Sequence, residues 1–497
     1  MIRVKKDYLL EAIVFICGGV VMVFELIGSR LIGPYVGTSI YAWTSLIGVI
    51  LASLSLGYYF GGRLADKNPN RNFLGTIIAF SGVLIYLTVF FENGGLLSIN
   101  MFSSLELRSV IISIILFAPA SFFLGMVSPY AARLRVNNLE TVGRDVGRLY
   151  ALSTVGSIFG TFLAGFYIIP NFGTKASLFI IAASLMVASI LLVGKKFVRD
   201  QAMLISIVMF IFLVVFNHFA EPIFSAFVIA DIDTQYNRIR IYNGTDLATG
   251  KSTINFSTDP FGTQGAVFSD NTGDLVFEYT KFFRLAGYFN PKIESALMIG
   301  GCIYTYPRDF IKNFPEARMD IVEIDPAMTQ IAKDYFYFND SPAFSFFYQD
   351  GRIFLNDNKR EYDVIFNDAF NSSSSVPFQL ATKEAIQKEF DALNDDGVVL
   401  SNIISSAEGE QGKFFRAEYA TYKKVFPQVF VFLVSDETSP EKRQNIIIVA
   451  SKSKKVFDFK AASEELNEYL GHLWNPIKGD TLVLTDDFAP VEYYQRR

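Results

Sequence analysis

The chain has 497 residues, 51% of them hydrophobic, with a formal net charge of −5, two histidines and two cysteines. The length permits two or three domains, and the acidic balance gives no reason to expect a nucleic acid partner. Because Cys17 and Cys302 lie far apart in segments of different type, neither a disulfide framework nor a metal site is expected.

The first 219 residues read as membrane sequence. Seven apolar stretches are long enough to cross about 30 Å of hydrocarbon, and the mean hydropathy of the whole chain is +0.31. Small residues recur within these stretches and predict close packing between helices, although a transport role is the alternative. The stretches are 8–29, 40–61, 73–91, 109–131, 149–169, 175–194 and 201–219, and the glycines are Gly18, Gly19, Gly57, Gly61, Gly62, Gly156, Gly160 and Gly165.

Glu25 is a carboxylate inside the first apolar stretch. Such a group is costly in a membrane and usually faces the bundle interior or a polar partner. Arg30 lies five residues further on and is a candidate partner, which predicts a structural lock. The alternative is a substrate or lipid site inside the bundle.

The distribution of basic residues predicts an orientation that conflicts with the chemistry expected of the second half. With the N-terminus inside, the inner segments hold thirteen Lys and Arg residues against three outside, which favours this orientation. Seven crossings then place the C-terminal half outside, where nucleotide substrates are scarce. The inner residues are Arg3, Lys5, Lys6, Arg63, Lys67, Arg71, Arg133, Arg135, Arg144, Arg148, Lys195, Lys196 and Arg199, and the outer ones are Arg30, Arg108 and Lys175.

After Phe219 the pattern changes to that of a water-soluble fold. Short alternating runs at 238–242, 252–256 and 265–268 predict a small antiparallel β element. From about residue 281, strands and helices alternate, which predicts a largely parallel sheet with helices on both faces. The expected strands are 296–300, 319–323, 344–348, 362–367, 397–403, 428–434 and 444–450, and the expected helices are 275–287, 306–313, 326–335, 352–356, 382–393, 411–425 and 461–471.

Three domains follow from these patterns. They are a transmembrane domain over 1–219, a small β element over 220–280 and an α/β Rossmann-like domain over 281–497. The cell membrane is the expected location. The side on which the C-terminal half lies is left open, because the charge bias favours the outside and the supply of substrate favours the cytoplasm.

One segment has the layout of a nucleotide-binding βαβ unit. The apolar run that begins at Ala296 enters Gly300 and Gly301, and a second apolar run ends in Glu323 about twenty residues later. Glycines let the backbone approach a ligand, and an acid at this position accepts hydrogen bonds from ribose hydroxyls. Asp350 and Asp368 also fall at expected strand ends, where ligands bind in such sheets.

These residues resemble the spermidine synthase family of aminopropyltransferases, which has a class I methyltransferase-like fold. The resemblance covers about 231–450, and the whole chain is similar to membrane-fused bacterial members of that family. It rests on the motifs Tyr236-Asn-Arg-Ile, Phe277-Glu-Tyr279, Ile299-Gly-Gly301, Val322-Glu-Ile-Asp-Pro326, Gln349-Asp-Gly-Arg352, Tyr362-Asp-Val-Ile-Phe-Asn-Asp-Ala-Phe370 and Asp396-Gly-Val-Val399, with Phe24-Glu-Leu-Ile-Gly-Ser-Arg30, Gly61-Gly-Arg-Leu-Ala-Asp66 and Leu484-Thr-Asp-Asp-Phe-Ala-Pro490 outside them.

The resemblance implies a role for each acid at the strand ends. Glu323 binds the ribose, Asp350 accepts from the adenine amino group, and Gly351 permits close approach. The alternative is that Glu323 and Asp350 only cap the helices that follow them. The resemblance implies that Asp368 is the catalytic base, which orients an amine and takes its proton during attack on a carbon beside a sulfonium.

The resemblance also implies substrate contacts. Tyr279 matches a substrate-site tyrosine, or is a buried helix aromatic. Tyr236, Asn237 and Asn371 stand at substrate-binding positions. The run 371–375, an asparagine followed by four serines, stands where a gating loop is expected, and a plain surface loop is the alternative. The partners are then a small-molecule amine or nucleoside and the lipid bilayer, with no nucleic acid and no metal, and a homodimer is left open.

Three departures from the family pattern limit the expected function. Ile303 stands where a loop aspartate should hold the amine of decarboxylated S-adenosylmethionine, and an unpaired buried ammonium is costly. Asn371 stands where the family pattern has a second acid, and Asn237 stands where it has a glutamine.

Three hypotheses follow from the resemblance and its departures. The first is a transferase that uses S-adenosylmethionine or its decarboxylated form and releases methylthioadenosine, with cyclisation or elimination of the same substrate as a variant. The second is a methyltransferase, because the fold is shared. The third is a transporter or sensor that binds a nucleoside without turnover.

Overall fold

The computed structural model describes residues 8–37, 39–90, 104–136, 139–194, 200–224, 228–259, 262–369, 377–435, 438–475 and 482–495. The chain divides into two compact units, Met1–Phe227 and Val228–Arg497. Each unit is described by itself.

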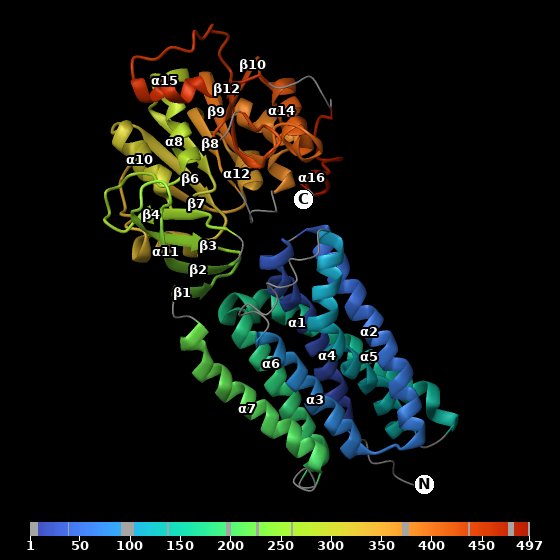
Figure 1. Ribbon diagram of the computed structural model, residues 1–497. Helices are drawn as coiled ribbons and strands as arrows, with labels where there is room; N and C mark the ends of the chain where they lie inside the picture. The colour runs from blue at the N-terminus through green and yellow to red at the C-terminus, as the bar shows by residue number, and fades with distance from the viewer. Residues whose placement is uncertain are drawn as a thin grey trace. The chain divides into compact units, whose positions relative to one another are not determined.

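The first unit consists of long apolar helices that pack side by side (Figure 1). Within the described residues these helices number seven, which agrees with the seven apolar stretches of the sequence. By length and composition, six segments of the described residues suit membrane spans, with residues 142–193 counted as one segment. They are α1 (Tyr8–Val36), α2 (Ile40–Lys67), α3 (Arg71–Phe90), α4 (Leu105–Arg135), α5 (Val142–Leu163), α6 (Ile169–Val193) and α7 (Gln201–Phe224).

A continuous apolar segment of 52 residues, Val142–Val193, contains both α5 and α6. A straight helix of that length would extend far beyond a bilayer. Gly173 breaks the segment, because its φ of 68° lies in the left-handed region, which glycine adopts without a steric cost. A π-helical turn, Ala164–Ile168, precedes the break.

Glycines hold two helix pairs in close contact, as the sequence predicts. A Cβ atom on Gly156 in α5 would lie 2.0 Å from the carbonyl oxygen of Phe15 in α1, and one on Gly57 in α2 would lie 2.2 Å from that of Phe122 in α4. By contrast, Gly165 has no neighbour within 4 Å of such an atom. Most of the recurring glycines therefore serve packing.

Contacts between helix ends show which ends lie together in the bundle. Glu11 at the start of α1 is buried and forms ion pairs with Arg135 at the end of α4 (3.3 Å) and Arg148 near the start of α5 (2.8 Å). A Cβ atom on Gly75, near the start of α3, would meet the side chain of Val193, at the end of α6. The amide of Asn70, just before α3, donates to the hydroxyl of Tyr130 in the last turns of α4 over 3.2 Å, which places all these helix ends together. Because α7 begins only eight residues after α6 ends, the start of α1 and the end of α7 lie at opposite ends of the bundle. The role of Glu25 stays a prediction.

The second unit begins with a four-stranded antiparallel sheet in the order β1-β2-β3-β4. Its strands are β1 (Val228–Asp233), β2 (Arg238–Thr245), β3 (Ser252–Ser257) and β4 (Gly265–Phe268). The sequence predicts three of these strands and misses β1. A buried apolar cluster joins this sheet to α11 through Ile241, Phe256, Ile303 and Met328.

An eight-stranded sheet in the order β12-β10-β11-β9-β8-β5-β6-β7 forms the centre of the unit. Five neighbouring strands pair in parallel, but β11, β10 and β12 pair antiparallel, so the sheet is mixed where the sequence predicts a largely parallel one. The strands are β5 (Ser295–Ile299), β6 (Arg318–Glu323), β7 (Phe344–Tyr348), β8 (Tyr362–Asn367), β9 (Leu393–Ser405), β10 (Gln428–Leu433), β11 (Gln444–Ser451) and β12 (Leu473–Trp474).

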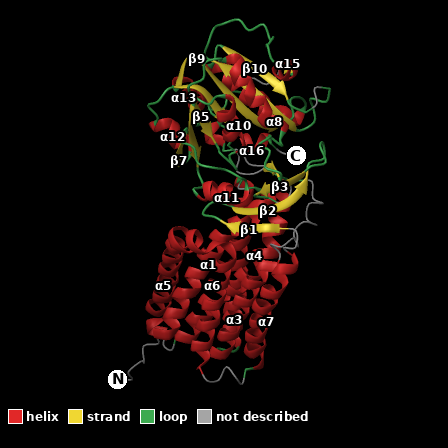
Figure 2. Cartoon of the chain, turned by 90° about the vertical axis from the view of Figure 1, so that its left-hand side faces the viewer, coloured by secondary structure: helices red, strands yellow, loops and turns green. Residues whose placement is uncertain are grey.

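Helices cover both faces of the large sheet (Figure 2), and alternate residues of each strand enter two separate cores. In β5, Met298 belongs to the core that includes Phe310 of α10, and Leu297 belongs to the core that includes Ile386 of α13. The expected helix 275–287 is instead two short helices around a 3-10 turn. The helices are α8 (Glu278–Phe282), α9 (Ala286–Phe289), α10 (Thr305–Asn313), α11 (Ala327–Tyr335), α12 (Gly351–Asp357), α13 (Lys383–Asp391), α14 (Lys413–Val425), α15 (Glu464–Gly471) and α16 (Val491–Tyr494).

Candidate active site

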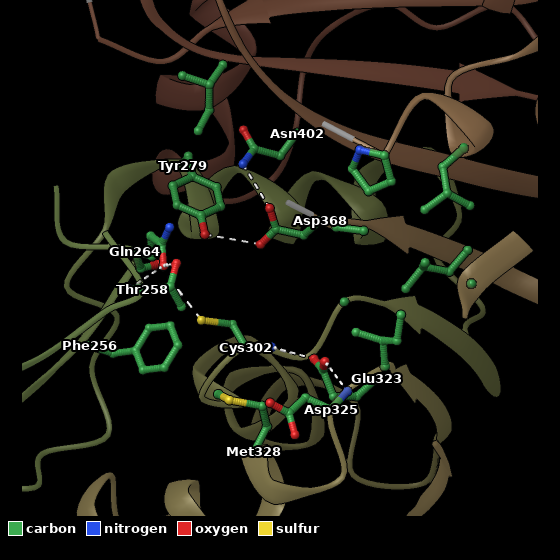
Figure 3. A pocket seen from close by; sticks show the side chains of 18 of the residues that line it. Phe256, Thr258, Gln264, Tyr279, Cys302, Glu323, Asp325, Met328, Asp368 and Asn402 are labelled. Carbon is green, nitrogen blue, oxygen red and sulfur yellow. Dashed lines mark hydrogen bonds between the residues drawn. The ribbon is translucent and has the colours of Figure 1, made fainter. Parts of the chain in front are cut away.

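A cavity of about 530 Å³ lies at the C-terminal ends of the parallel strands. The chain runs from β5 to β6 and β7 and then returns to β8 on the other side of β5, so the strand order reverses between β5 and β8. Ligands of open α/β sheets bind at such a reversal. Figure 3 shows the cavity with Tyr279, Asp368 and Asn402 on one side and Glu323 and Met328 on another.

The turn after β5 requires glycine at two positions. Gly300 has a φ of 87°, and a Cβ atom there would lie 2.5 Å from the carbonyl oxygen of Asp368. A Cβ atom on Gly301 would lie 2.1 Å from the ring of Tyr304. Cys302 also lines the cavity, and burial raises the pKa of its thiol, which keeps it protonated. A nucleophilic role for Cys302 has no support here.

Glu323, at the end of β6, is buried in the cavity wall and bound by backbone amides. Its Oε2 accepts from the amides of Gly301 (3.0 Å) and Cys302 (3.3 Å), and its Oε1 accepts from the amide of Asp325 (3.1 Å). Burial raises its pKa, while these hydrogen bonds oppose the rise. Glu323 therefore holds the glycine turn in place and does not cap α11.

Asp350 lines the same cavity and also caps a helix. Its Oδ1 accepts from the amides of Arg352 (2.8 Å) and Ile353 (3.2 Å), which satisfies the first turn of α12. Asp350 therefore caps α12 from a position in the cavity lining, and its ligand role stays a prediction. At Gly351, the space for a Cβ atom is filled by the side chain of Ile299, at 2.7 Å.

Asp368 follows β8 and is held by one donor on each carboxylate oxygen. Its Oδ1 accepts from Asn402 (2.8 Å) and its Oδ2 from the hydroxyl of Tyr279 (3.1 Å), as Figure 3 shows. Burial raises the pKa of Asp368 to about 6, against the lowering effect of these two hydrogen bonds. A carboxylate with this pKa is ionised near neutral pH and is well suited to accept a proton.

Asn402 and Asn445 are cavity residues that the sequence reading misses. The amide nitrogen of Asn445 in β11 donates to the amide oxygen of Asn402 in β9 over 2.9 Å, and Asn402 in turn donates to Asp368. Three neighbouring strands thus supply a chain of hydrogen bonds that ends on the candidate base. No local motif marks these asparagines, because only strand pairing brings β9 and β11 together.

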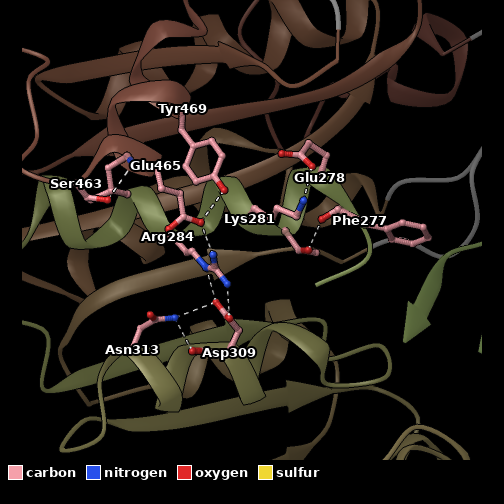
Figure 4. A network of polar contacts seen from close by, with 11 residues as sticks. Phe277, Glu278, Lys281, Arg284, Asp309, Asn313, Ser463, Glu465 and Tyr469 are labelled. Atoms are coloured by element: carbon pink, nitrogen blue, oxygen red, sulfur yellow. Dashed lines mark hydrogen bonds and ion pairs between the residues drawn. The ribbon is translucent and has the colours of Figure 1, made fainter. Parts of the chain in front are cut away.

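A polar network fixes the helix that carries Tyr279 (Figure 4). Arg284, in the turn after α8, forms a two-point ion pair with the buried carboxylate of Asp309 in α10, at 2.6 and 2.8 Å. Its third nitrogen contacts Glu465 in α15, which also accepts from the hydroxyl of Tyr469 (2.9 Å). The position of Tyr279 therefore depends on contacts far along the chain.

The expected substrate-binding residues have different outcomes. Asn237 lines the cavity, whereas Tyr236 lies outside its lining and is 42% exposed in the β1–β2 turn. Asn371 and the proposed gating loop 371–375 lie outside the described residues. Ile303, which stands where the family pattern has an aspartate, is buried in the apolar cluster with Phe256 and Met328. Its side chain therefore contributes to packing.

Among the described residues that line the cavity, five carry carboxylates and none is Lys, Arg or His. The acidic residues are Glu278, Glu323, Asp325, Asp350 and Asp368. This charge distribution favours a cationic ligand and disfavours an anionic one.

The fold and the cavity at the strand reversal define a class I methyltransferase-type α/β domain. Residues 276–461 match the model of the spermine/spermidine synthase domain. The C-terminal unit therefore carries a spermine/spermidine synthase-like domain over these residues.

Individual relatives agree with this family. The chain is similar to the polyamine aminopropyltransferase of Vibrio vulnificus (strain CMCP6), with 34% identity over 167 residues that cover 33% of this chain and 54% of that protein. It is 28% identical over 278 residues to the probable polyamine aminopropyl transferase of Bifidobacterium longum (strain NCC 2705), covering 52% and 60% of the two chains. The chain thus spans a little over half the length of these two relatives. The spermidine synthase structure from Thermotoga maritima matches 55% of this chain and 84% of that one, with 22% identity and a TM-score of 0.38.

Proposed function

We propose that the C-terminal unit transfers an aminopropyl group from decarboxylated S-adenosylmethionine to an amine and releases methylthioadenosine. The observation that carries this proposal is the placement of Asp368. It is an ionisable base fixed on both oxygens, at the strand reversal, in a cavity lined by carboxylates. The names of the relatives support the same reaction class.

In the proposed reaction, the amine nitrogen attacks the methylene carbon beside the sulfonium. The new C–N bond forms as the C–S bond breaks, and the electron pair of that bond stays on sulfur, which becomes a neutral thioether. The proton of the attacking nitrogen passes to Asp368. Tyr279 and Asn402 hold the carboxylate in place, so the main contribution of the site is orientation.

The charges of the cavity support the decarboxylated substrate over full S-adenosylmethionine. The full form carries an α-carboxylate, and burying it without a cation is costly. The described lining offers five acids and no basic side chain for that purpose. The decarboxylated form has only positive charges near its sulfur and meets no such penalty.

Glu323 and Asp350 are proposed to bind the nucleoside, with Gly300 and Gly301 forming the turn beside it. The Glu323 carboxylate has lone pairs beyond those that accept the three hydrogen bonds from backbone amides, so ribose hydroxyls can still donate to it. Asp350 has one oxygen on the first turn of α12 and one near Gln379 (3.3 Å). Both roles follow from the strand-end position of these acids.

The test uses the full chain purified in detergent or nanodiscs. It is incubated with full or decarboxylated S-adenosylmethionine, with and without a panel of mono-, di- and triamines, and the nucleoside product is identified by mass spectrometry. Methylthioadenosine that appears only with the decarboxylated form and an amine supports the proposal. S-adenosylhomocysteine would instead indicate a methyltransferase, and the absence of any product would indicate a binding protein.

We also propose that the first unit spans a membrane and that residue 228 onward lies on the non-cytoplasmic side. The helix ends that carry most of the basic residues lie with the start of α1, and the end of α7 lies at the opposite end of the bundle. Because basic segments stay in the cytoplasm, an odd number of crossings carries the chain outward before β1 begins.

A further inference from the structure

Asn445, Asn402 and Asp368 form a line of hydrogen bonds across neighbouring strands. Asn445 pairs with Ile404 across the β9–β11 ladder, two positions from Asn402, so both asparagines point to the same face of the sheet. Both line the cavity together with Asp368. The two contacts have ordinary hydrogen-bond lengths, 2.9 Å and 2.8 Å between nitrogen and oxygen.

The charge of Asp368 fixes the direction of the whole line. An ionised carboxylate only accepts hydrogen bonds, so Asn402 must turn its NH₂ group toward Asp368. The oxygen of Asn402 then faces Asn445, so Asn445 must donate a hydrogen bond to it from its own NH₂ group. The oxygen of Asn445 is therefore the end of the line, and it has no hydrogen-bond partner among the described residues.

We propose that Asn445 has two tasks in the aminopropyl transfer: it keeps Asn402 in the orientation that stabilises ionised Asp368, and its free oxygen accepts an N–H of the acceptor amine. Asn445 is thus a positioning residue for the base and a selecting residue for the acceptor. The inference rests on the proposed function. It also assigns the acceptor to the side of the cavity that β9 and β11 form, away from Glu323.

The groups that face Asp368 from other elements allow the positioning task to be measured. Tyr279 approaches from α8, and Cys302 approaches from the turn after β5. Burial raises the pKa of both the phenol and the thiol, so neither ionises near neutral pH. Glu323 lies on the cofactor side of the cavity. Behind Asn367 and Asn402, burial raises the pKa of Glu389 and Glu418 to about 8, above that of Asp368. The limb near pH 6 therefore reports Asp368, and loss of the bond from Asn402 moves that limb upward.

Two variants separate the two tasks. Asn445→Leu removes both the donor and the acceptor, so the acid limb of kcat/KM moves up by about half to one unit. The KM for the amine rises about tenfold, while the KM for the nucleoside substrate stays within about twofold. Asn445→Asp has the same shape and keeps an acceptor in the cavity but cannot donate to Asn402. It moves the acid limb further upward, because it adds a negative charge, and leaves the amine KM close to that of the wild type.

Asn356→Leu, an exposed asparagine in α12, is the matched control and changes neither quantity. The isosteric Asn445→Asp variant keeps the test valid if the leucine variant fails to fold. An unchanged acid limb and an unchanged amine KM in an active Asn445→Leu protein would overturn this inference and leave the proposed function intact. A wild-type protein that releases no methylthioadenosine with any amine would remove both.

Discussion

The backbone of Asp368 occupies the space where a side chain on Gly300 would lie: a Cβ atom there would be 2.5 Å from the carbonyl oxygen and 2.8 Å from the carbonyl carbon. The amide of Asp368 also donates to the carbonyl oxygen of Ile299 over 2.9 Å. The glycine turn and the candidate base are therefore parts of one rigid junction between β5 and β8.

The first prediction concerns this junction. Gly300→Ala combines an unfavourable φ of 87° with a backbone clash, so we expect a loss of about 2–4 kcal/mol in unfolding free energy and loss of product. Thermal and denaturant unfolding with a nucleoside-release assay measure both. Gly250→Ala is the control, because Gly250 has a φ of 70° with no neighbour within 4 Å. Equal losses in the two variants would show that the clash is unimportant.

The second prediction concerns Asp368 as the base. Asp368→Asn keeps the shape of the side chain but cannot accept a proton, so we expect product formation to fall by about 10²–10⁴-fold. Nucleoside affinity should stay within a few fold. Asp357→Asn, an exposed residue in α12, serves as the control. Full activity of the Asp368→Asn protein would rule out the mechanism.

The third prediction concerns pH. The base must be ionised to act, and burial raises the pKa of Asp368 to about 6. Activity should therefore rise as pH increases through about 6 and level off above it, with the amine held saturating. A pH–rate profile measured from pH 5 to 8 checks this. A flat profile over that range would contradict the assignment of Asp368.

The fourth prediction concerns Glu323. Glu323→Ala leaves the buried amides of Gly301 and Cys302 without an acceptor, which costs about 1–3 kcal/mol and loosens the glycine turn. We expect the affinity for methylthioadenosine, measured by calorimetry, to fall at least about tenfold. Glu294→Ala, exposed at the opposite end of β5, should not change it. Unchanged affinity in the Glu323 variant would refute its role in binding.

The fifth prediction concerns orientation in the membrane. Leu247 is 98% exposed in the second unit, and Lys67 is exposed at the end of α2, on the basic side of the bundle. A membrane-impermeant maleimide should label Leu247→Cys in intact cells and Lys67→Cys only after permeabilisation. The wild-type chain, with its own two cysteines, gives the background. The reverse pattern, or labelling of both sites from one side, would contradict an odd number of crossings.

The sequence alone determined most of the local structure, because local structure depends on short-range patterns. The seven apolar stretches correspond to seven helices, since a span needs about twenty apolar residues in a row. The alternation of apolar runs and glycines located β5 through β11 to within a few residues. The acids at strand ends, Glu323, Asp350 and Asp368, were visible for the same reason and all line the cavity.

Tertiary structure decided what depends on strand pairing and on distant contacts. The antiparallel direction of β10, β11 and β12 leaves no trace in the local pattern of burial, so the mixed sheet was not predicted. Asn402 and Asn445 gained their position from the register of β9 with β11, and Tyr279 gained its position from distant contacts such as its bond to Asp368. A residue 25 to 43 positions away in sequence becomes a neighbour through folding alone. Sequence patterns of short period carry no information on such pairs.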